Sequence, residues 1–255
     1  MAAFPLMLPG TSRPPKLVVF DLDHTLIACD ATILWTEFLY EKKIVTDPIW
    51  RQYDRDMVKS YAKGVLDIRD FCRKHAGAFR SIPEEKLHAL AQEFAKKKIA
   101  PLIFPDGKKW VKNALQANIP ACVLSASAAF IVKPIAKFFG LTDAMGIELA
   151  FKDGFCTGEI VGIPTFQEGK VERLSQRLAE AGIGFEDVLF FTDSRNDLPL
   201  AERAGYTVCV NPDAVLESAA RKNGWKVAEW KLSLRTQMTA QVDAKGVPET
   251  QTVRS

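Results

Sequence analysis

Short apolar runs alternate with amphipathic segments along much of the chain. Four runs, rich in β-branched and aromatic side chains, predict buried strands. They cover residues 17–20, 121–124, 188–191 and 206–210. Between them apolar residues recur at helical spacing, with helices expected from Asp106, from about Glu168 and around 198–204. Strands that alternate with helices predict an α/β fold with a doubly wound, mostly parallel sheet.

The pattern changes between residues 29 and 103, where apolar positions follow helical spacing and no convincing strand occurs. Four helices are predicted there from start and stop signals. The starts are Asp30, Asp47-Pro48, Asp67 and Pro83, and Gly64 ends the second helix. We therefore predict a core built from residues 16–28 and 104–230, with an all-helical cap inserted at residues 29–103.

Three other segments have patterns of their own. Residues 147–151 and 158–161 flank Asp153-Gly154, a turn signal that predicts a hairpin projecting from the core. Residues 1–15 contain four prolines and predict a flexible arm. Residues 231–255 lack apolar periodicity and predict a disordered tail.

Composition narrows the classes of partner and the compartment. The 255 residues carry 34 Lys and Arg against 31 Asp and Glu, so the net charge of +3 is too balanced to predict binding to nucleic acid. No apolar stretch approaches the length that spans a bilayer, and the first residues lack the basic start of a secretory signal, so no stable membrane insertion is expected. The sequence does not predict an oligomeric state.

The five cysteines are an odd number, scattered, and without the spacing of a zinc site. We interpret them as reduced thiols. Together with the missing secretory signal, this predicts a cytoplasmic protein.

Two carboxylates follow the first predicted strand directly. Asp21 and Asp23 come after residues 17–20, and Thr25 follows them. In open α/β sheets the carboxyl ends of the strands line the ligand crevice, so these side chains are candidates for chemistry. An Asx turn or a helix N-cap is the alternative interpretation, and it accounts for one acid more easily than for two.

The segment Asp21-Leu22-Asp23-His24-Thr25 resembles the Asp-x-Asp-x-Thr signature of the haloacid dehalogenase superfamily. Three further motifs follow in that family's order: Ser125 after a second strand, Gly169-Lys170 at a helix start, and Thr192-Asp193-Ser194-Arg195-Asn196-Asp197 after another strand. Together they resemble the phosphoserine-phosphatase-like branch, subfamily IB, over roughly residues 16–230. The resemblance implies a Rossmann-like core with a helical cap, and a phosphatase.

The resemblance also implies a role for each acid. Asp21 would be the nucleophile that forms an aspartyl-phosphate, and Asp23 would protonate the leaving group and then activate water. Mg²⁺ would be held by Asp21, Asp193 and the backbone carbonyl of Asp23. The electrostatics agree, because two carboxylates repel a phosphate dianion unless a hard cation lies between them. Asp197 would not bind the metal directly and would orient either a metal-bound water or the lysine. The alternative interpretation is that Asp197 caps the helix predicted at Leu198.

Three residues would bind the phosphate in this resemblance: Ser125, Lys170 and Asn196. Ser125 precedes a predicted helix start, where backbone N–H groups also favour anions. Taken alone, a serine there is equally a helix cap, and Lys170 is equally a surface lysine.

Substrate recognition is predicted to involve Asp30, Arg73 and His75. Asp30 matches the acid that binds the substrate amine in phosphoserine phosphatases, although it can also simply cap the first cap helix. The arginine that grips the serine carboxylate is replaced by His75, with Arg73 as a nearby substitute. Imidazole cannot reproduce the two-pronged hydrogen bonding of a guanidinium, which weakens the phosphoserine interpretation.

Histidinol phosphate is therefore the preferred substrate: it carries an amine without a carboxylate. Arg195 stands where phosphoserine phosphatases have a small residue, and with it this motif resembles a subfamily-IB group linked to the hydrolysis of histidinol phosphate and of phosphatidylglycerophosphate. Phosphoserine and phosphatidylglycerophosphate are the alternatives. The second acid, Asp23, argues against dehalogenation, since halide needs no proton. A non-catalytic relative that only binds phosphorylated ligands is the alternative of a different class.

Overall fold

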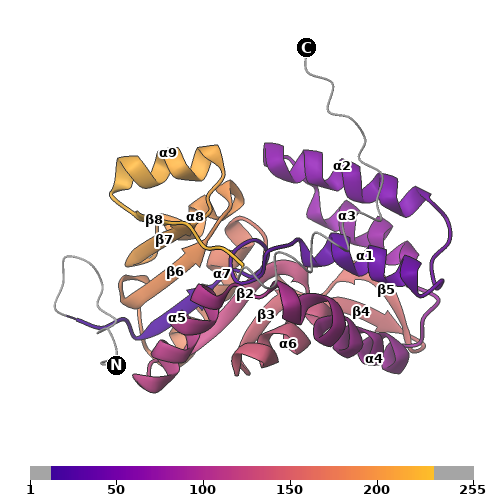
Figure 1. The fold of residues 1–255 in the computed structure, drawn as a ribbon, viewed down its shortest axis with the longest axis horizontal. Helices are drawn as coiled ribbons and strands as arrows, with labels where there is room; N and C mark the ends of the chain where they lie inside the picture. Colours follow the sequence, from indigo (N-terminus) through magenta and orange to yellow (C-terminus); the bar gives the residue numbers. More distant parts are fainter. Residues whose placement is uncertain (1–12, 233–255) are drawn as a thin grey trace, which may run out of the picture.

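The structure is a computed structural model that describes residues 13–232 (Figure 1). The predicted N-terminal arm and C-terminal tail lie almost wholly outside these residues. No helix within the described range has the length and apolar character needed to cross a membrane.

A six-stranded parallel sheet forms the core, with the strand order β3-β2-β1-β6-β7-β8. Its strands are β1 (Leu17–Phe20), β2 (Ala121–Ala128), β3 (Ala144–Ile147), β6 (Val188–Thr192), β7 (Tyr206–Val210) and β8 (Lys226–Ala228). Chain order and space order differ, because the chain leaves the central β1 toward β2 and β3 and later returns to its other side. The predicted doubly wound α/β fold is confirmed.

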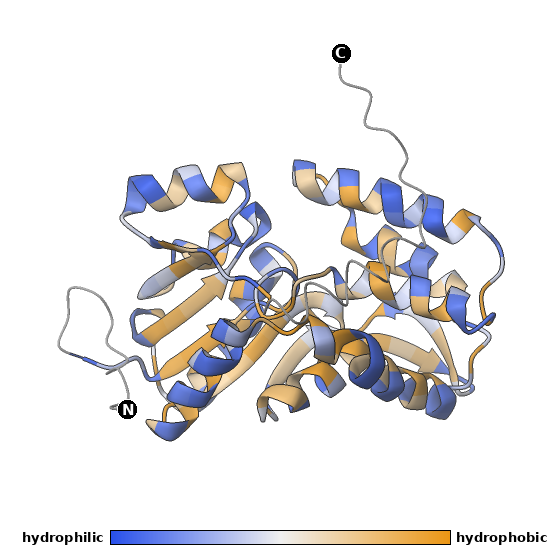
Figure 2. Ribbon diagram, in the orientation of Figure 1, coloured by the Kyte–Doolittle hydropathy of each residue, from blue (hydrophilic) through white to orange (hydrophobic). Residues whose placement is uncertain are grey.

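Alternation along β1 explains why helices cover both faces of the sheet. Val18 and Phe20 point to one face and pack with α5 (Pro105–Gln116) and α6 (Ala129–Ala136). Leu17 and Val19 point to the other. That second face is covered by α7 (Glu168–Ala181) and α8 (Leu198–Ala201), while α9 (Ala214–Asn223) packs on β7. Figure 2 shows that the strands of the sheet are mainly hydrophobic, whereas the helices around them carry both hydrophobic and hydrophilic residues.

Four helices gather on one side of this core (Figure 1). They are α1 (Ala31–Glu41), α2 (Ile49–Lys63), α3 (Ile68–His75) and α4 (Glu84–Phe94). Trp35, Phe38 and Phe94 pack edge-on and tilted against one another at their centre. The start and stop signals hold: Asp30 and Asp67 accept backbone N–H groups at the starts of α1 and α3, and Gly64 ends α2 in the left-handed region.

The hairpin of β4 (Leu149–Lys152) and β5 (Phe155–Ile160) lies against α3. Gly158 makes this approach possible: a Cβ there would lie 2.7 Å from the Ala76 side chain and 2.9 Å from backbone atoms of α3. The hairpin was predicted, and its packing on a cap helix was not.

The sequence pattern missed β3, α9 and β8, and it ended β2 four residues early. Gly146 weakens the strand signal of β3, yet it is required, because a Cβ there would lie 2.8 Å from the backbone of Ala129. β8 is a three-residue edge strand with an exposed Val227, so it lacks the apolar run of a buried strand.

Candidate active site

The sheet topology brings Asp21 and Asp193 together. β1 and β6 are adjacent and parallel, with Phe20 beside Phe191, and the Asp21 N–H donates to the Phe191 carbonyl at 2.9 Å. The chain turns to opposite sides of the sheet after these two strands. Their carboxyl ends therefore form the switch point at which α/β sheets bind ligands.

Lys170 lies between two of the acids. Its Nζ is 2.7 Å from an oxygen of Asp21 and 2.7 Å from one of Asp197, and only 1% of its side chain is exposed. Burial lowers the pKa of Lys170, but the two carboxylates outweigh burial and raise it above the usual value. The lysine thus stays charged, as a buried, paired ammonium should.

Local structure fixes the position of this lysine. A Cβ at Gly169 would lie 1.9 Å from the Pro164 carbonyl, so only glycine allows α7 to start there. Asp197 precedes α8 without capping it; its carboxylate instead accepts from Thr192 Oγ1 at 2.7 Å and contacts Lys170. Asp197 therefore contacts the lysine directly, as one of its two predicted roles requires.

Asp193 adds a third carboxylate to the same cluster and accepts from Thr25 Oγ1 at 3.3 Å. Burial and the charges of Asp21 and Asp197 raise the pKa of Asp193 well above its usual value. Burial also raises the pKa of Asp21, to about 7, against the opposing effect of Lys170. Two buried carboxylates and the partly exposed Asp193 thus share one ammonium, an excess of negative charge that a divalent cation would offset.

The donor set fits a hard cation. Carboxylate oxygens of Asp21 and Asp193 and the backbone carbonyl of Asp23 are the oxygen ligands that Mg²⁺ prefers. Within residues 13–232 no three His, Cys, Asp or Glu side chains form a metal group by themselves. The predicted set needs only two side chains, so the remaining ligands would be the carbonyl, substrate and water.

Asp23 is held by groups from two elements. Its Oδ2 accepts from Ser127 Oγ at 2.8 Å and from Ser125 Oγ at 3.2 Å, while its Oδ1 accepts from the Ala31 N–H at 2.6 Å. Burial, followed by the charge of Asp30, raises the pKa of Asp23 to about 6. A carboxyl group with such a pKa can carry a proton near neutral pH.

Ser125 reaches this acid from a strand, whereas the sequence placed it just before a helix. β2 continues to Ala128, and α6 begins only at Ala129. Ser127 is a site residue that the sequence analysis did not assign. Its position two residues after Ser125 could have indicated this, because residues two apart on a strand point to the same face.

Asn196 contacts the cap. Its amide donates to the Tyr61 carbonyl at 3.0 Å and its oxygen accepts from Gln167 Nε2 at 3.1 Å, while Gln167 also donates to the Gly64 carbonyl at 3.2 Å. These two carbonyls belong to the last turn and C-cap of α2, where a helix leaves acceptors free. The two amides thus fasten the end of α2 to the core.

Tyr61 and Gln167 were not predicted as site residues. Burial and the charges of Asp197, Asp21 and Asp193 raise the pKa of the Tyr61 hydroxyl well above its usual value, which places this side chain beside the acids. A tyrosine in an i+4 apolar stripe gives no sequence signal for such a position.

The structure brings Asp30 to the acids, but it brings neither Arg73 nor His75. Asp30 caps α1 through Oδ1 and also lines a cavity of about 50 Å³. That cavity is lined by Asp23, His24, Asp30, Thr32, Met57, Tyr61, Leu66, Ile68, Phe71, Ala126, Ser127 and Asp193. Arg73 lies in another hollow beside Trp50, and His75 is buried inside the cap.

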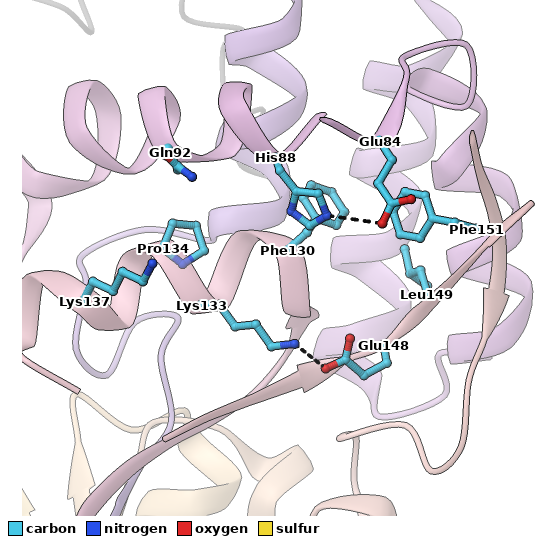
Figure 3. Close-up of a pocket in the computed structure, with 10 residues that line it drawn as sticks. All are labelled: Glu84, His88, Gln92, Phe130, Lys133, Pro134, Lys137, Glu148, Leu149 and Phe151. Carbon is cyan, nitrogen blue, oxygen red and sulfur yellow. Dashed lines mark hydrogen bonds and ion pairs between the residues drawn. The ribbon is translucent and has the colours of Figure 1, made fainter. Parts of the chain in front are cut away.

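A larger hollow of about 370 Å³ lies between α4, α6 and β4, and it contains none of the predicted site residues (Figure 3). Its charged groups largely pair with one another: His88 with Glu84 at 3.7 Å, and Lys133 with Glu148 at 2.7 Å. The acidic cluster at the sheet edge is therefore the candidate active site.

Comparison with known proteins agrees with this geometry. The sequence profile of the haloacid dehalogenase-like hydrolases matches residues 18–202. A histidinol-phosphatase of Neisseria meningitidis serogroup C (strain 8013) is 35% identical over 220 residues, covering 85% of this chain and 99% of the relative.

Two solved structures share the fold. A protein of unknown function from Bordetella pertussis Tohama I has a TM-score of 0.75 and 32% identity, covering 83% of this chain and 96% of its own. A phospho-aspartyl intermediate analogue of phosphoserine phosphatase has a TM-score of 0.64 at 21% identity, covering 89% and 99%. The predicted family is confirmed, and the chain belongs to the haloacid dehalogenase-like hydrolases.

Proposed function

We propose that this phosphoric monoester hydrolase uses Asp21 as a nucleophile and passes through an aspartyl-phosphate. The observation that carries the proposal is the position of Asp21: it ends β1 at the switch point, 2.7 Å from the buried Lys170 ammonium. An ionised carboxylate beside a fixed cation can approach a phosphate dianion. Attack forms the bond from Asp21 oxygen to phosphorus and breaks the bond from phosphorus to the ester oxygen.

Asp23 supplies the proton in this scheme. With its pKa raised to about 6, it gives a proton to the departing alkoxide and then takes one from the water that hydrolyses the aspartyl-phosphate. Ser127 and Ser125 hold the carboxyl group in place through Oδ2. Ser125 and Lys170 would bind phosphate oxygens, as the family resemblance implies.

Mg²⁺ would be held by Asp21, Asp193 and the Asp23 carbonyl. When bound, it would neutralise charge on the phosphoryl oxygens. Asp197 keeps Lys170 oriented, and Thr25 holds Asp193. The roles of Asp21 and Asp193 both depend on their being ionised, which the excess of acidic charge opposes until a cation binds.

Histidinol phosphate is the proposed substrate. The described residues that line the cavity include three aspartates and no lysine or arginine, so a substrate carboxylate would find no cation there while an amine would find Asp30. The relative named histidinol-phosphatase supports the same choice. Phosphoserine carries the carboxylate that this cavity disfavours. Phosphatidylglycerophosphate lacks the amine that would pair with Asp30.

We propose the cytoplasm as the compartment, because all five cysteines are free and four are buried. The buried thiols need no oxidising environment to be stable.

The test is hydrolysis of histidinol phosphate, phosphoserine and phosphatidylglycerophosphate side by side, with Mg²⁺ and after chelation. We expect Mg²⁺-dependent turnover with histidinol phosphate preferred, and a higher KM for histidinol phosphate in Asp30→Ala. Asp67→Ala is the matched control, since Asp67 also caps a helix but does not line the cavity. Preference for phosphoserine would overturn the substrate, and absence of turnover on any phosphate ester would favour a binding protein.

A further inference from the structure

A second buried cluster of polar side chains lies deeper in the cap than the cavity at the acids. The cavity is lined by Thr32 of α1, Met57 of α2 and Phe71 of α3. Thr36 and His75 follow Thr32 and Phe71 by one helical turn, and Asp54 precedes Met57 by one turn. Residues at this spacing share a face of their helix. Thr36 Oγ1 donates to the Thr32 carbonyl, and the His75 ring stacks on Phe71 with ring centroids 5.1 Å apart, so the cluster lies directly behind two residues of the cavity lining.

Asp54 is the unusual member. It is only 4% exposed, and within residues 13–232 its carboxylate oxygens form no hydrogen bond of good geometry, although the Thr36 hydroxyl is close enough to lower the pKa of Asp54. His75 Nε2 is 3.7 Å away, beyond hydrogen-bonding distance. Buried carboxylates are normally satisfied by several donors, so this one has unused capacity for two or more N–H or O–H groups.

Its neighbours cannot fill that capacity. Thr36 has one hydroxyl proton, and its Oγ1 lies 3.0 Å from His75 Nε2 and 3.3 Å from the Thr32 carbonyl. Burial lowers the pKa of His75 to about 4, so the ring is neutral. Burial raises the pKa of Asp54 to about 7 against the opposing effect of the Thr36 hydroxyl, with Asp30 and Glu37 adding to the rise and Arg55 opposing it. The neutral His75 ring, 3.7 Å from Asp54, therefore gives this carboxylate no ion pair.

We propose that Asp54, with His75 and Thr36, is the subsite for a nitrogen-bearing, N–H-donating head group of the substrate. This inference rests on the proposed function, because it takes the phosphate end to lie at Asp21. A cationic or N–H-donating ring supplies the donors that Asp54 lacks, and the neutral His75 ring and Thr36 hydroxyl provide a further donor and acceptor. A carboxylate at this position would be repelled by Asp54.

The spacing along α2 suits a small extended ester. Tyr61 lies beside the core acids, and Asp54 is seven residues earlier on the same helix, about 10 Å along its axis. Asp30, at the start of α1, lines the cavity together with Tyr61 and is close enough to raise the pKa of Asp54. A substrate with a phosphate at one end, an amine in the middle and an N–H ring at the other would meet Asp21, Asp30 and Asp54 in turn.

The test compares two substrates in the full-length protein: histidinol phosphate, and an aryl phosphate that has no N–H group. We expect Asp54→Asn to lower the ratio of their kcat/KM values by about 10- to 100-fold, mainly through KM for histidinol phosphate, as loss of hydrogen bonds to a charged group should. Asp54→Glu should recover part of the ratio. Asp56→Asn, exposed on the same helix, is the control and should leave it unchanged.

A purely structural role gives a different result. If Asp54 only supports the cap, Asp54→Asn will lower both activities equally and leave the ratio within twofold, which overturns the inference. If the wild-type protein hydrolyses the aryl phosphate but not histidinol phosphate, the proposed substrate and this subsite both fail while the phosphatase chemistry stands.

If Asp54→Asn does not fold, the wild-type protein still gives an answer. Histidinol, the dephosphorylated product, should shift the imidazole NMR signals of His75. No shift at saturating histidinol would contradict the subsite.

Discussion

The core and the cap each bury carboxylates, and they do so in opposite ways. At the sheet edge, Asp21 and Asp197 share the ammonium of Lys170 at 2.7 Å. Inside the cap, Asp54 is equally buried, yet among residues 13–232 it has no cationic partner and its oxygens form no hydrogen bond of good geometry. In the first cluster the chain supplies a cation to two of the acids, whereas in the second the described part of the chain supplies none. This difference is what the two proposals rest on: catalysis at Asp21 and binding of a substrate head group at Asp54.

The largest effect should come from the nucleophile. Asp21→Asn keeps the shape of the side chain but cannot form the aspartyl-phosphate, so kcat for an aryl phosphate should fall on the order of 10⁴-fold or more. Steady-state kinetics with a folded variant, checked by circular dichroism, measures this. A fall of less than tenfold would show that Asp21 is not the attacking group.

Lys170→Met tests whether the core cluster is held together by its own cation. The variant leaves Asp21 and Asp197 buried without the cation that they share, so the free energy of unfolding should fall by about 3–5 kcal/mol. Denaturant titration measures this. Lys59→Met, which removes an exposed ion pair on α2, should change stability far less. If both variants lose the same free energy of unfolding, the buried Lys170 contributes no more to stability than an exposed lysine does.

The pH dependence of stability tests the cap cluster. The folded-state pKa of Asp54 is about 7, above that of an unfolded chain near 4, so the folded form holds a proton that the unfolded form releases. Asp54 therefore lowers stability progressively as pH rises from about 4 to about 7. Asp54→Asn should gain stability relative to the wild type across that range, on the order of 3 kcal/mol at pH 8, and match it near pH 4.

His75 acts in the opposite direction, which is why the variant must be compared with the wild type at each pH. Its lowered pKa, about 4, makes the unfolded chain bind the proton first as pH falls, so stability is lost below about 6.5. A stability difference between wild type and Asp54→Asn that does not change with pH would mean that Asp54 has an ordinary pKa.

The smallest effect concerns the point where cap and core meet. Gly64 has φ of +71°, and a Cβ there would lie 3.3 Å from Arg195 Nε. Gly64→Ala should lower the free energy of unfolding by about 1 kcal/mol, as a side chain in the left-handed region does. Gly182→Ala is matched, with φ of +65° and nothing within 4 Å of the added Cβ. The free energy of unfolding should fall by a few tenths of a kcal/mol more in Gly64→Ala than in Gly182→Ala. An equal or smaller fall would show that the Arg195 side chain moves away from the added methyl group without cost.

The core half of the site was predictable from sequence because strand ends fix side chains. Asp21 and Asp193 each follow a short apolar run, and adjacent parallel strands bring such ends together. Lys170 could be placed only through its motif, since nothing in its helical pattern distinguishes a buried lysine from a surface one. Its burial depends on α7 packing against the sheet.

The cap half was not predictable, because helices present their residues according to tertiary packing. Asp54 stands among polar residues of α2 and carries no sign of burial. His75 was chosen by position, and the structure puts it in the cap interior beside Thr36; Arg73, two residues earlier, lies in a different hollow. Which face of a helix meets its neighbours is decided by contacts between distant segments, and local periodicity does not contain them.

The central claim is that Asp21 takes up the phosphoryl group. The most direct measurement is rapid acid quenching of the enzyme during turnover of histidinol phosphate with Mg²⁺, followed by mass spectrometry of the peptide that contains residues 17–25. The account predicts a phosphoryl group on Asp21 that forms and decays with turnover and is missing in Asp21→Asn. Turnover with an unmodified Asp21, or with the phosphoryl group on another residue, would contradict it.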